Sequence, residues 1–254
     1  MIKTFNNENI LSKNLALEIL KKLKNKKKLV LGCPGGRSIK KTYYYLGLLS
    51  FKHKIDLDKL IIVMMDEYVV KKNNKFSLVD PKSHYSCVRY SKNVIKKLLN
   101  YKKNKKNSLK ENNILFPSVI NPSNYDKIIK KLGGIDIFLL ASGSSDGHVA
   151  FNNAYSKINQ NTHITKLHIS TRRDNMKTFS QFTNLKEVPK YGLTVGLKTI
   201  SSLSKSAILV MSGKEKKQAY RNIFSLKKYD KSWPASIIYN CKNNKIYIDK
   251  SVKK

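Results

Sequence analysis

The chain has no long apolar run. No stretch of its 254 residues approaches the ~20 consecutive apolar residues that span a bilayer. Its first residues, MIKTFNNENILSKN, lack the apolar core of a secretory signal peptide. These absences argue against a membrane protein and against a secreted one. We therefore expect a cytoplasmic protein with no membrane partner.

Cysteine is scarce, and the three cysteines, Cys33, Cys87 and Cys241, lie far apart in the sequence. No pair has the C-x-x-C spacing that is typical of zinc ligands and redox sites, so neither a disulfide framework nor a metal site is predicted. Cys33 precedes a glycine-containing loop, which leaves a nucleophilic role open. However, no feature of the sequence supplies the base that such a thiol needs. We expect reduced thiols.

Acidic residues are few as well: 16 Asp and Glu stand against 51 Lys and Arg, which gives a net charge of +35. Such a field attracts nucleic acids and anionic lipids without specificity. However, the excess is almost entirely lysine spread along the whole chain. Only five residues are arginine, the side chain that base readout and bidentate phosphate recognition favour. We expect no specific nucleic-acid partner.

Short apolar runs alternate with amphipathic stretches. Residues 8–27 carry an apolar stripe at helical spacing, and KLVLGC at 28–33 is typical of a buried strand. Further strands are predicted at 59–65, 135–141, 165–169, 193–195, 207–211 and 245–248, and further helices end near 48 and 99 and span 121–132 and 213–224. This alternation predicts an α/β fold, a three-layer sandwich on a mostly parallel, modified doubly wound (Rossmann-like) sheet.

One domain is enough for residues 1–254, because α/β folds of ~250 residues are common. The segment at 101–113 is the part richest in lysine and asparagine. Since strand and helix alternation resumes directly after it, we expect a surface excursion there and not a linker between domains.

Glycine-rich and polar segments follow several of the predicted strands. In a parallel sheet such loops meet beyond the carboxyl ends of the strands, where ligands bind. The first loop reads Gly35-Gly36-Arg37-Ser38, and glycine there lets backbone N–H groups approach an anion. Lys216, in the last of these loops, is a second cation for the same anion. We predict a phosphate site, with a plain turn as the alternative.

Two other loops carry acid–base side chains. Asp66 and Glu67 end an apolar strand, where a partly desolvated carboxylate has a raised pKa and serves as a base. A cap at the strand end is the alternative. Asp146-Gly147-His148 follows another apolar strand and places a histidine beside a carboxylate that can orient it. We predict a catalytic site that contains Asp66, Asp146 and His148.

Together these segments resemble the glucosamine-6-phosphate deaminase and 6-phosphogluconolactonase superfamily, and its deaminase branch more closely, over about residues 29–249. The resemblance rests on five segments that occur in the order and near the spacing of that branch. They are Met65-Asp66-Glu67-Tyr68-Val69, Ser83-His84-Tyr85, Asp146 to Asn152 (DGHVAFN), Val188 to Gly196 (VPKYGLTVG) and Trp233.

The resemblance implies an enzyme of amino-sugar catabolism that converts glucosamine 6-phosphate to fructose 6-phosphate and ammonia, without a metal or organic cofactor. It implies that Asp66 moves a proton between C1 and C2 of the open-chain sugar, and that Asp146 and His148 open the pyranose ring. It also implies that a group of loop residues binds the small-molecule sugar phosphate: Gly35, Gly36, Arg37, Ser38, Glu67, Lys177 and Lys216.

The chain departs from the family pattern at several positions. Asn153 stands where deaminases have the glutamate of the ring-opening set, and an asparagine can orient a histidine but cannot take a proton. The Gly-Gly-Arg-Ser loop is closer to the lactonase branch, whereas Tyr68 stands where lactonases usually have arginine. The alternatives are therefore 6-phosphogluconolactone hydrolysis and a catalytically weak sugar-phosphate binder. A monomer and a homo-oligomer are both open.

Overall fold

The fold is that of a computed structural model that describes residues 1–253, except for the side chain of Arg37. The strands are β1 (Ile2–Phe5), β2 (Leu29–Cys33), β3 (Leu60–Met64), β4 (Asp66–Lys72), β5 (Lys75–Leu78), β6 (Ile114–Leu115), β7 (Ile137–Ala141), β8 (His163–Lys166), β9 (Tyr191–Thr194), β10 (Ala207–Met211) and β11 (Lys245–Asp249). The α-helices are α1 (Glu8–Lys24), α2 (Lys40–Lys52), α3 (Cys87–Tyr90), α4 (Lys97–Leu99), α5 (Asn124–Lys131), α6 (Ile169–Thr178), α7 (Leu197–Leu203) and α8 (Lys217–Leu226).

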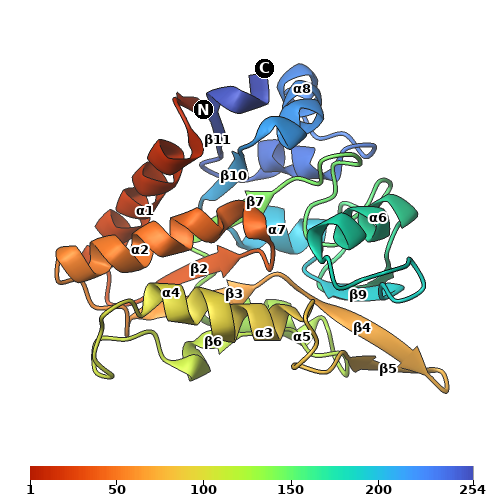
Figure 1. The fold of residues 1–254 in the computed structure, drawn as a ribbon, viewed down its shortest axis with the longest axis horizontal. Helices are drawn as coiled ribbons and strands as arrows, with labels where there is room; N and C mark the ends of the chain where they lie inside the picture. The colour runs from red at the N-terminus through yellow and green to blue at the C-terminus, as the bar shows by residue number, and fades with distance from the viewer. Residues whose placement is uncertain (254) are drawn as a thin grey trace.

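The central sheet has seven strands in the order β1-β11-β10-β7-β2-β3-β6, and every neighbouring pair is parallel. Alternate residues of β2 face opposite sides: Leu29 and Leu31 pack with α1 and α2, and Val30 packs with α5, α7 and α8. Figure 1 shows α1 and α2 side by side over one part of the sheet. The predicted three-layer α/β sandwich is confirmed.

A second sheet, which the sequence analysis did not predict, is antiparallel and has the order β5-β4-β9-β8. The chain passes from β3 into β4 through the single residue Met65, whose carbonyl accepts a hydrogen bond from Val195 N–H at 2.8 Å. The strands predicted at 165–169 and 193–195 both lie in this second sheet. They correspond to β8 and β9, and Ile169 already begins α6.

The first helix illustrates how the sequence sets element boundaries. The Asn7 side chain accepts a hydrogen bond from Ile10 N–H and so caps the start of α1, and Leu11, Leu15 and Ile19 form its buried stripe. The predicted range 8–27 was too long at its end, because α1 ends at Lys24. The helix predicted to end near 99 consists of α3, a π-helical segment at Ser91–Lys96 and α4.

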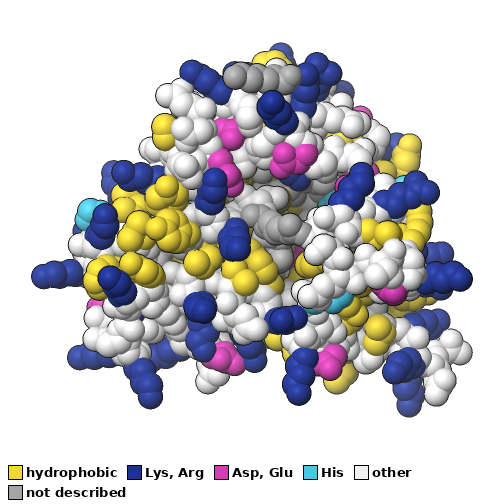
Figure 2. Space-filling view, in the orientation of Figure 1, with side chains coloured by type: hydrophobic (Ala, Val, Ile, Leu, Met, Phe, Trp, Pro, Cys, Tyr) yellow, Lys and Arg dark blue, Asp and Glu magenta, His cyan; other side chains and the backbone are white. Residues whose placement is uncertain are grey.

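The segment 101–113 is mostly exposed, as expected for a surface excursion, but Leu109 is buried in the core and anchors it. Figure 2 shows lysine and arginine side chains spread over the whole visible face and not gathered over one element. Within residues 1–253, no helix combines the length and the apolar character that a bilayer span requires.

Close packing between β2 and β7 generates a stability prediction. A Cβ atom at Gly32 would lie 2.2 Å from the ring of buried Phe138, so Gly32→Ala is expected to lower the free energy of unfolding by about 1–3 kcal/mol. Gly36→Ala is the matched control, because nothing lies within 4 Å of its added Cβ. Urea denaturation measures both variants; equal stabilities would contradict this account of the strand pair.

Candidate active site

A cavity of about 940 Å³ lies beyond the carboxyl ends of β2, β3, β7 and β10. Residues that follow each of these strands form much of its wall, and the C-terminal part of α6 adds to it. Members of the four loops in the wall include Pro34, Gly35, Gly36, Ser38, Met65, Asp66, Ser142, Gly143, Ser144, Ser145, His148, Ser212, Gly213, Glu215 and Lys216. The structure thus brings together the loops that the sequence places at this edge.

Asp66 is a buried carboxylate in the cavity wall, at the first position of β4. Its Oδ1 accepts a hydrogen bond from the Cys87 thiol at 3.4 Å. Burial raises the pKa of Asp66 from its ordinary value of 3.8 to about 7, although the Cys87 thiol and His148 act in the opposite direction. A carboxyl group that titrates near neutral pH is suited to general acid–base catalysis.

Glu67, which the resemblance places among the substrate-binding residues, does not line the cavity. Its carboxylate accepts hydrogen bonds from the backbone N–H groups of Cys87 and Val88, at 3.0 and 2.8 Å, and from the Ser86 hydroxyl at 2.8 Å. Alternation along β4 points Glu67 away from the face that Asp66 occupies. Glu67 therefore fixes the start of α3.

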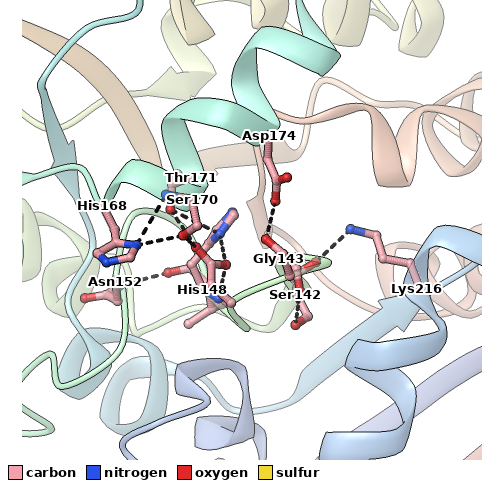
Figure 3. A network of polar contacts seen from close by, with 12 residues as sticks. Ser142, Gly143, His148, Asn152, His168, Ser170, Thr171, Asp174 and Lys216 are labelled. Atoms are coloured by element: carbon pink, nitrogen blue, oxygen red, sulfur yellow. Dashed lines mark hydrogen bonds and ion pairs between the residues drawn. The ribbon is translucent and has the colours of Figure 1, made fainter. Parts of the chain in front are cut away.

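Asp146 and His148 form a tightly held pair in the loop after β7, and Figure 3 shows His148 beside Ser170 and Thr171. The Oδ1 atom of Asp146 lies 2.6 Å from Nδ1 of His148, and its Oδ2 atom accepts hydrogen bonds from the hydroxyls of Ser170 and Thr171 at 2.5 and 2.9 Å. Burial opposes ionisation, but these hydrogen bonds and the charge of His148 lower the pKa of Asp146 well below its usual range. Asp146 is therefore a fixed anion.

Two glycines let the loop close around this pair. A Cβ atom at Gly143 would lie 2.3 Å from Nδ1 of His148 and 2.4 Å from Oδ1 of Asp146. Gly147 has a φ of +66°, which favours glycine. A Cβ atom at Gly147 would also lie 2.3 Å from the ring of Trp233. The glycines and Trp233 thus allow the geometry of the Asp146–His148 pair.

The sequence analysis missed Ser170 and Thr171, which lie in the first turn of α6. His168 caps this turn: its Nδ1 atom lies 2.7 Å from the Ser170 hydroxyl and accepts a hydrogen bond from Ser170 N–H. Histidine is not among the usual N-cap residues, so the sequence carries no standard signal for a helix start at His168. The strand predicted at 165–169 also extended into the first residue of α6.

Asn153, which stands at the position of the deaminase glutamate, is not among the residues that line the cavity. Its Nδ2 atom donates to the Lys166 carbonyl at 3.3 Å, and its Oδ1 atom accepts from the Ser156 hydroxyl at 3.4 Å. The histidine that it was expected to orient is held by Asp146 instead. Asn153 thus ties its loop to β8.

Cations and backbone groups line another part of the cavity. Lys216 donates to the Ser142 carbonyl at 2.8 Å, and burial lowers its pKa. Lys177, in the last turn of α6, and Ser38 also line the cavity. The side chain of Arg37, which was predicted to bind phosphate, lies outside the described part of the structure.

The Cys33 thiol is not part of this site. The side chain is fully buried among the residues that α1 and α2 pack against, and it does not line the cavity. Burial raises the pKa of its thiol to about 12, so the thiolate that nucleophilic attack requires is not formed near neutral pH. In the described residues, no group of three or more His, Cys, Asp or Glu side chains is arranged to hold a metal ion.

The sequence of this chain is similar to that of a known enzyme family. The family model for glucosamine-6-phosphate isomerases/6-phosphogluconolactonase matches residues 7–248. Two relatives named glucosamine-6-phosphate deaminase, from Mycoplasma mycoides subsp. mycoides and Alkaliphilus metalliredigens, are each 30% identical to this chain. Their alignments cover 96% and 94% of this chain and 93% of each relative.

Solved structures share the fold. A monomeric glucosamine-6-phosphate deaminase superposes with a TM-score of 0.81 at 25% identity, covering 99% of this chain and 98% of its own. The 6-phosphogluconolactonase of Thermotoga maritima superposes with a TM-score of 0.68 at 17% identity and covers 98% of both chains. The second likeness is one of fold alone.

The raised pKa of Asp66 predicts a pH-dependent cost to stability. The folded state holds this proton more tightly than the unfolded chain, so the contribution of Asp66 is most favourable below about pH 4 and is lost as pH rises to about 7. Asp66→Asn is therefore expected to be more stable than the parent protein above pH 7, by up to about 4 kcal/mol, and to lose this advantage near pH 4. Urea unfolding across this range measures the difference; a difference independent of pH would contradict the assignment.

Proposed function

Because the chain belongs to the glucosamine-6-phosphate isomerase/6-phosphogluconolactonase family, we propose that it converts glucosamine 6-phosphate to fructose 6-phosphate and ammonia. The observation that carries this proposal is the pairing, in one cavity, of a buried carboxyl group that titrates near pH 7 with a histidine held by an ionised carboxylate. Relatives at 30% identity that are named deaminases support the same reaction.

Ring opening is assigned to His148. Asp146 accepts the Nδ1 proton, so the lone pair of the ring lies on Nε2. In the proposed step, Nε2 takes the proton from the C1 hydroxyl and delivers it to the ring oxygen as the C1–O5 bond breaks, which gives the open-chain aldehyde. Asp146 stabilises the imidazolium that forms in between, and Ser170 and Thr171 hold Asp146 in place.

Isomerisation is assigned to Asp66. In the proposed step its carboxylate removes the C2 proton of the open-chain sugar while the substrate's ammonium group gives a proton to the aldehyde oxygen, which leaves an enolamine with a C1–C2 double bond. The carboxylic acid then returns a proton to C1, and the double bond shifts to the nitrogen as an iminium group at C2. Water adds to that carbon, and ammonia leaves with the remaining proton. A pKa of about 7 suits a group that must both accept and donate a proton.

Substrate binding is assigned to groups elsewhere in the cavity wall. Lys216 and Lys177 supply positive charge for the 6-phosphate, and the Ser38 hydroxyl and the Gly36 backbone supply further hydrogen-bonding groups. Gly35 also lines the cavity, but its backbone hydrogen bonds to Asp66. The steps proposed here are proton transfers and a hydrolysis, which require no organic cofactor. Asn153 has no part in them, because its amide is engaged with Lys166 and Ser156.

The test is release of ammonia and formation of fructose 6-phosphate from glucosamine 6-phosphate. Asp66→Asn is expected to lower kcat by about 10²–10⁴-fold, the usual effect of removing a general acid–base group. Asp80→Asn, which changes an exposed carboxylate outside the cavity, is the matched control and is expected to retain activity.

Hydrolysis of 6-phosphogluconolactone is measured in parallel with ammonia release from glucosamine 6-phosphate. Lactone hydrolysis without ammonia release would contradict the proposal and favour the lactonase alternative. Binding of the sugar phosphate with turnover of neither substrate would favour a weak binder.

A further inference from the structure

The Cys87 thiol lies in the wall of the cavity and touches the carboxyl group that the proposed reaction depends on. Its Sγ atom is 3.4 Å from Oδ1 of Asp66. A Cβ atom placed at Gly35 would lie 2.6 Å from the same sulfur and 3.1 Å from the same oxygen. The thiol, the carboxylate and the loop backbone are therefore packed together without room for another side chain.

The position of the thiol is fixed by groups outside the cavity. Cys87 is the first residue of α3, and its backbone N–H donates to Oε1 of Glu67 at 3.0 Å. The Ser86 hydroxyl binds the other oxygen of Glu67. Two adjacent residues of β4 therefore contact the start of α3. Glu67 accepts its hydrogen bonds and fixes the position of the helix, and Asp66 accepts a hydrogen bond from the side chain of its first residue, Cys87.

We propose that Cys87 is a positioning residue for the proposed isomerisation, and that its thiol donates a hydrogen bond which holds the Asp66 carboxylate in its base form and orientation. The proposal rests on the proposed function for its catalytic consequence. The contact itself is independent of that function.

The charges around Asp66 support this role. Burial and the neighbouring Glu67 raise the pKa of Asp66, whereas the Cys87 hydrogen bond, His148 and the Gly35 backbone lower it, and the thiol is the largest of the opposing effects. The hydroxyls of Tyr43, Tyr68 and Tyr125 also lie close enough to sense the Asp66 charge.

The thiol keeps its proton under these conditions. Burial raises the pKa of Cys87 well above its ordinary value, and the negative charges of Asp66 and Glu67 raise it further. A protonated thiol is a hydrogen-bond donor, although a weak one. Removing it leaves the Asp66 carboxylate with one donor fewer in a buried site, which favours the protonated acid.

The experiment compares Cys87→Ala, Cys87→Ser and the parent protein, with Cys241→Ala as the matched control. Cys241 is also a buried free cysteine, but it packs in a different core cluster from Cys87 and does not line the cavity. Two quantities are measured: the pH profile of kcat/KM for glucosamine 6-phosphate, and the titration of the Asp66 carboxyl carbon by ¹³C NMR in the free protein, assigned by its loss in Asp66→Asn.

For Cys87→Ala, the acid limb of the kcat/KM profile and the Asp66 titration are expected to move to higher pH by roughly 0.5–1 unit, which is about a 3–10-fold loss of kcat/KM on the acid side. Cys87→Ser keeps a donor and is expected to return both midpoints to the parent value or below, and Cys241→Ala is expected to leave them unchanged. The proposal would be overturned if Asp66 titrated at the same pH in Cys87→Ala and in the parent protein. It would also be overturned if Cys87→Ser did not restore the midpoint of the Asp66 titration. If the parent protein shows no turnover, the proposed function fails, and the NMR titration still decides whether the thiol acts on Asp66.

Discussion

The burial of the Asp66 carboxyl group is the constraint on which the rest of the site depends. Asp66 stands where the chain leaves the parallel sheet and enters the antiparallel one, so it is enclosed by elements of both sheets. Burying an ionisable group without a full ion-pair partner destabilises the folded state near neutral pH. The Cys87 thiol and the Gly35 backbone offset only part of that cost, and the carboxylate still lines the cavity.

The surroundings shift the pKa values of two carboxylates at this site, Asp66 and Asp146, in opposite directions. Asp66 has few donors, and burial raises its pKa to about 7. Asp146 is also partly buried, but hydrogen bonds from His148, Ser170 and Thr171 keep it ionised. Such a separation assigns distinct roles to like groups: Asp66 exchanges protons, and Asp146 orients and stabilises the histidine that does.

Much of the site could be predicted because strand–loop–helix alternation places loops at one edge of a parallel sheet, and because Asp66, Asp146 and His148 carry recognisable chemistry. The second sheet could not be predicted in this way, since its central pair, β4 and β9, joins residues more than 100 positions apart and the register of that pair is set by tertiary contacts. The roles of Glu67 and Asn153 depend on which way each side chain turns. Motif position alone does not determine that direction.

The central claim is that Asp66 moves the C2 proton of an open-chain sugar, and glucosamine 6-phosphate deuterated at C2 tests it most directly. The account predicts that ammonia release removes deuterium from C2, and that NMR of the product finds the label at C1 of fructose 6-phosphate or in the solvent. Ammonia release that leaves deuterium at C2, with a glucose phosphate as product, would mean direct hydrolysis of the C–N bond and would contradict the account.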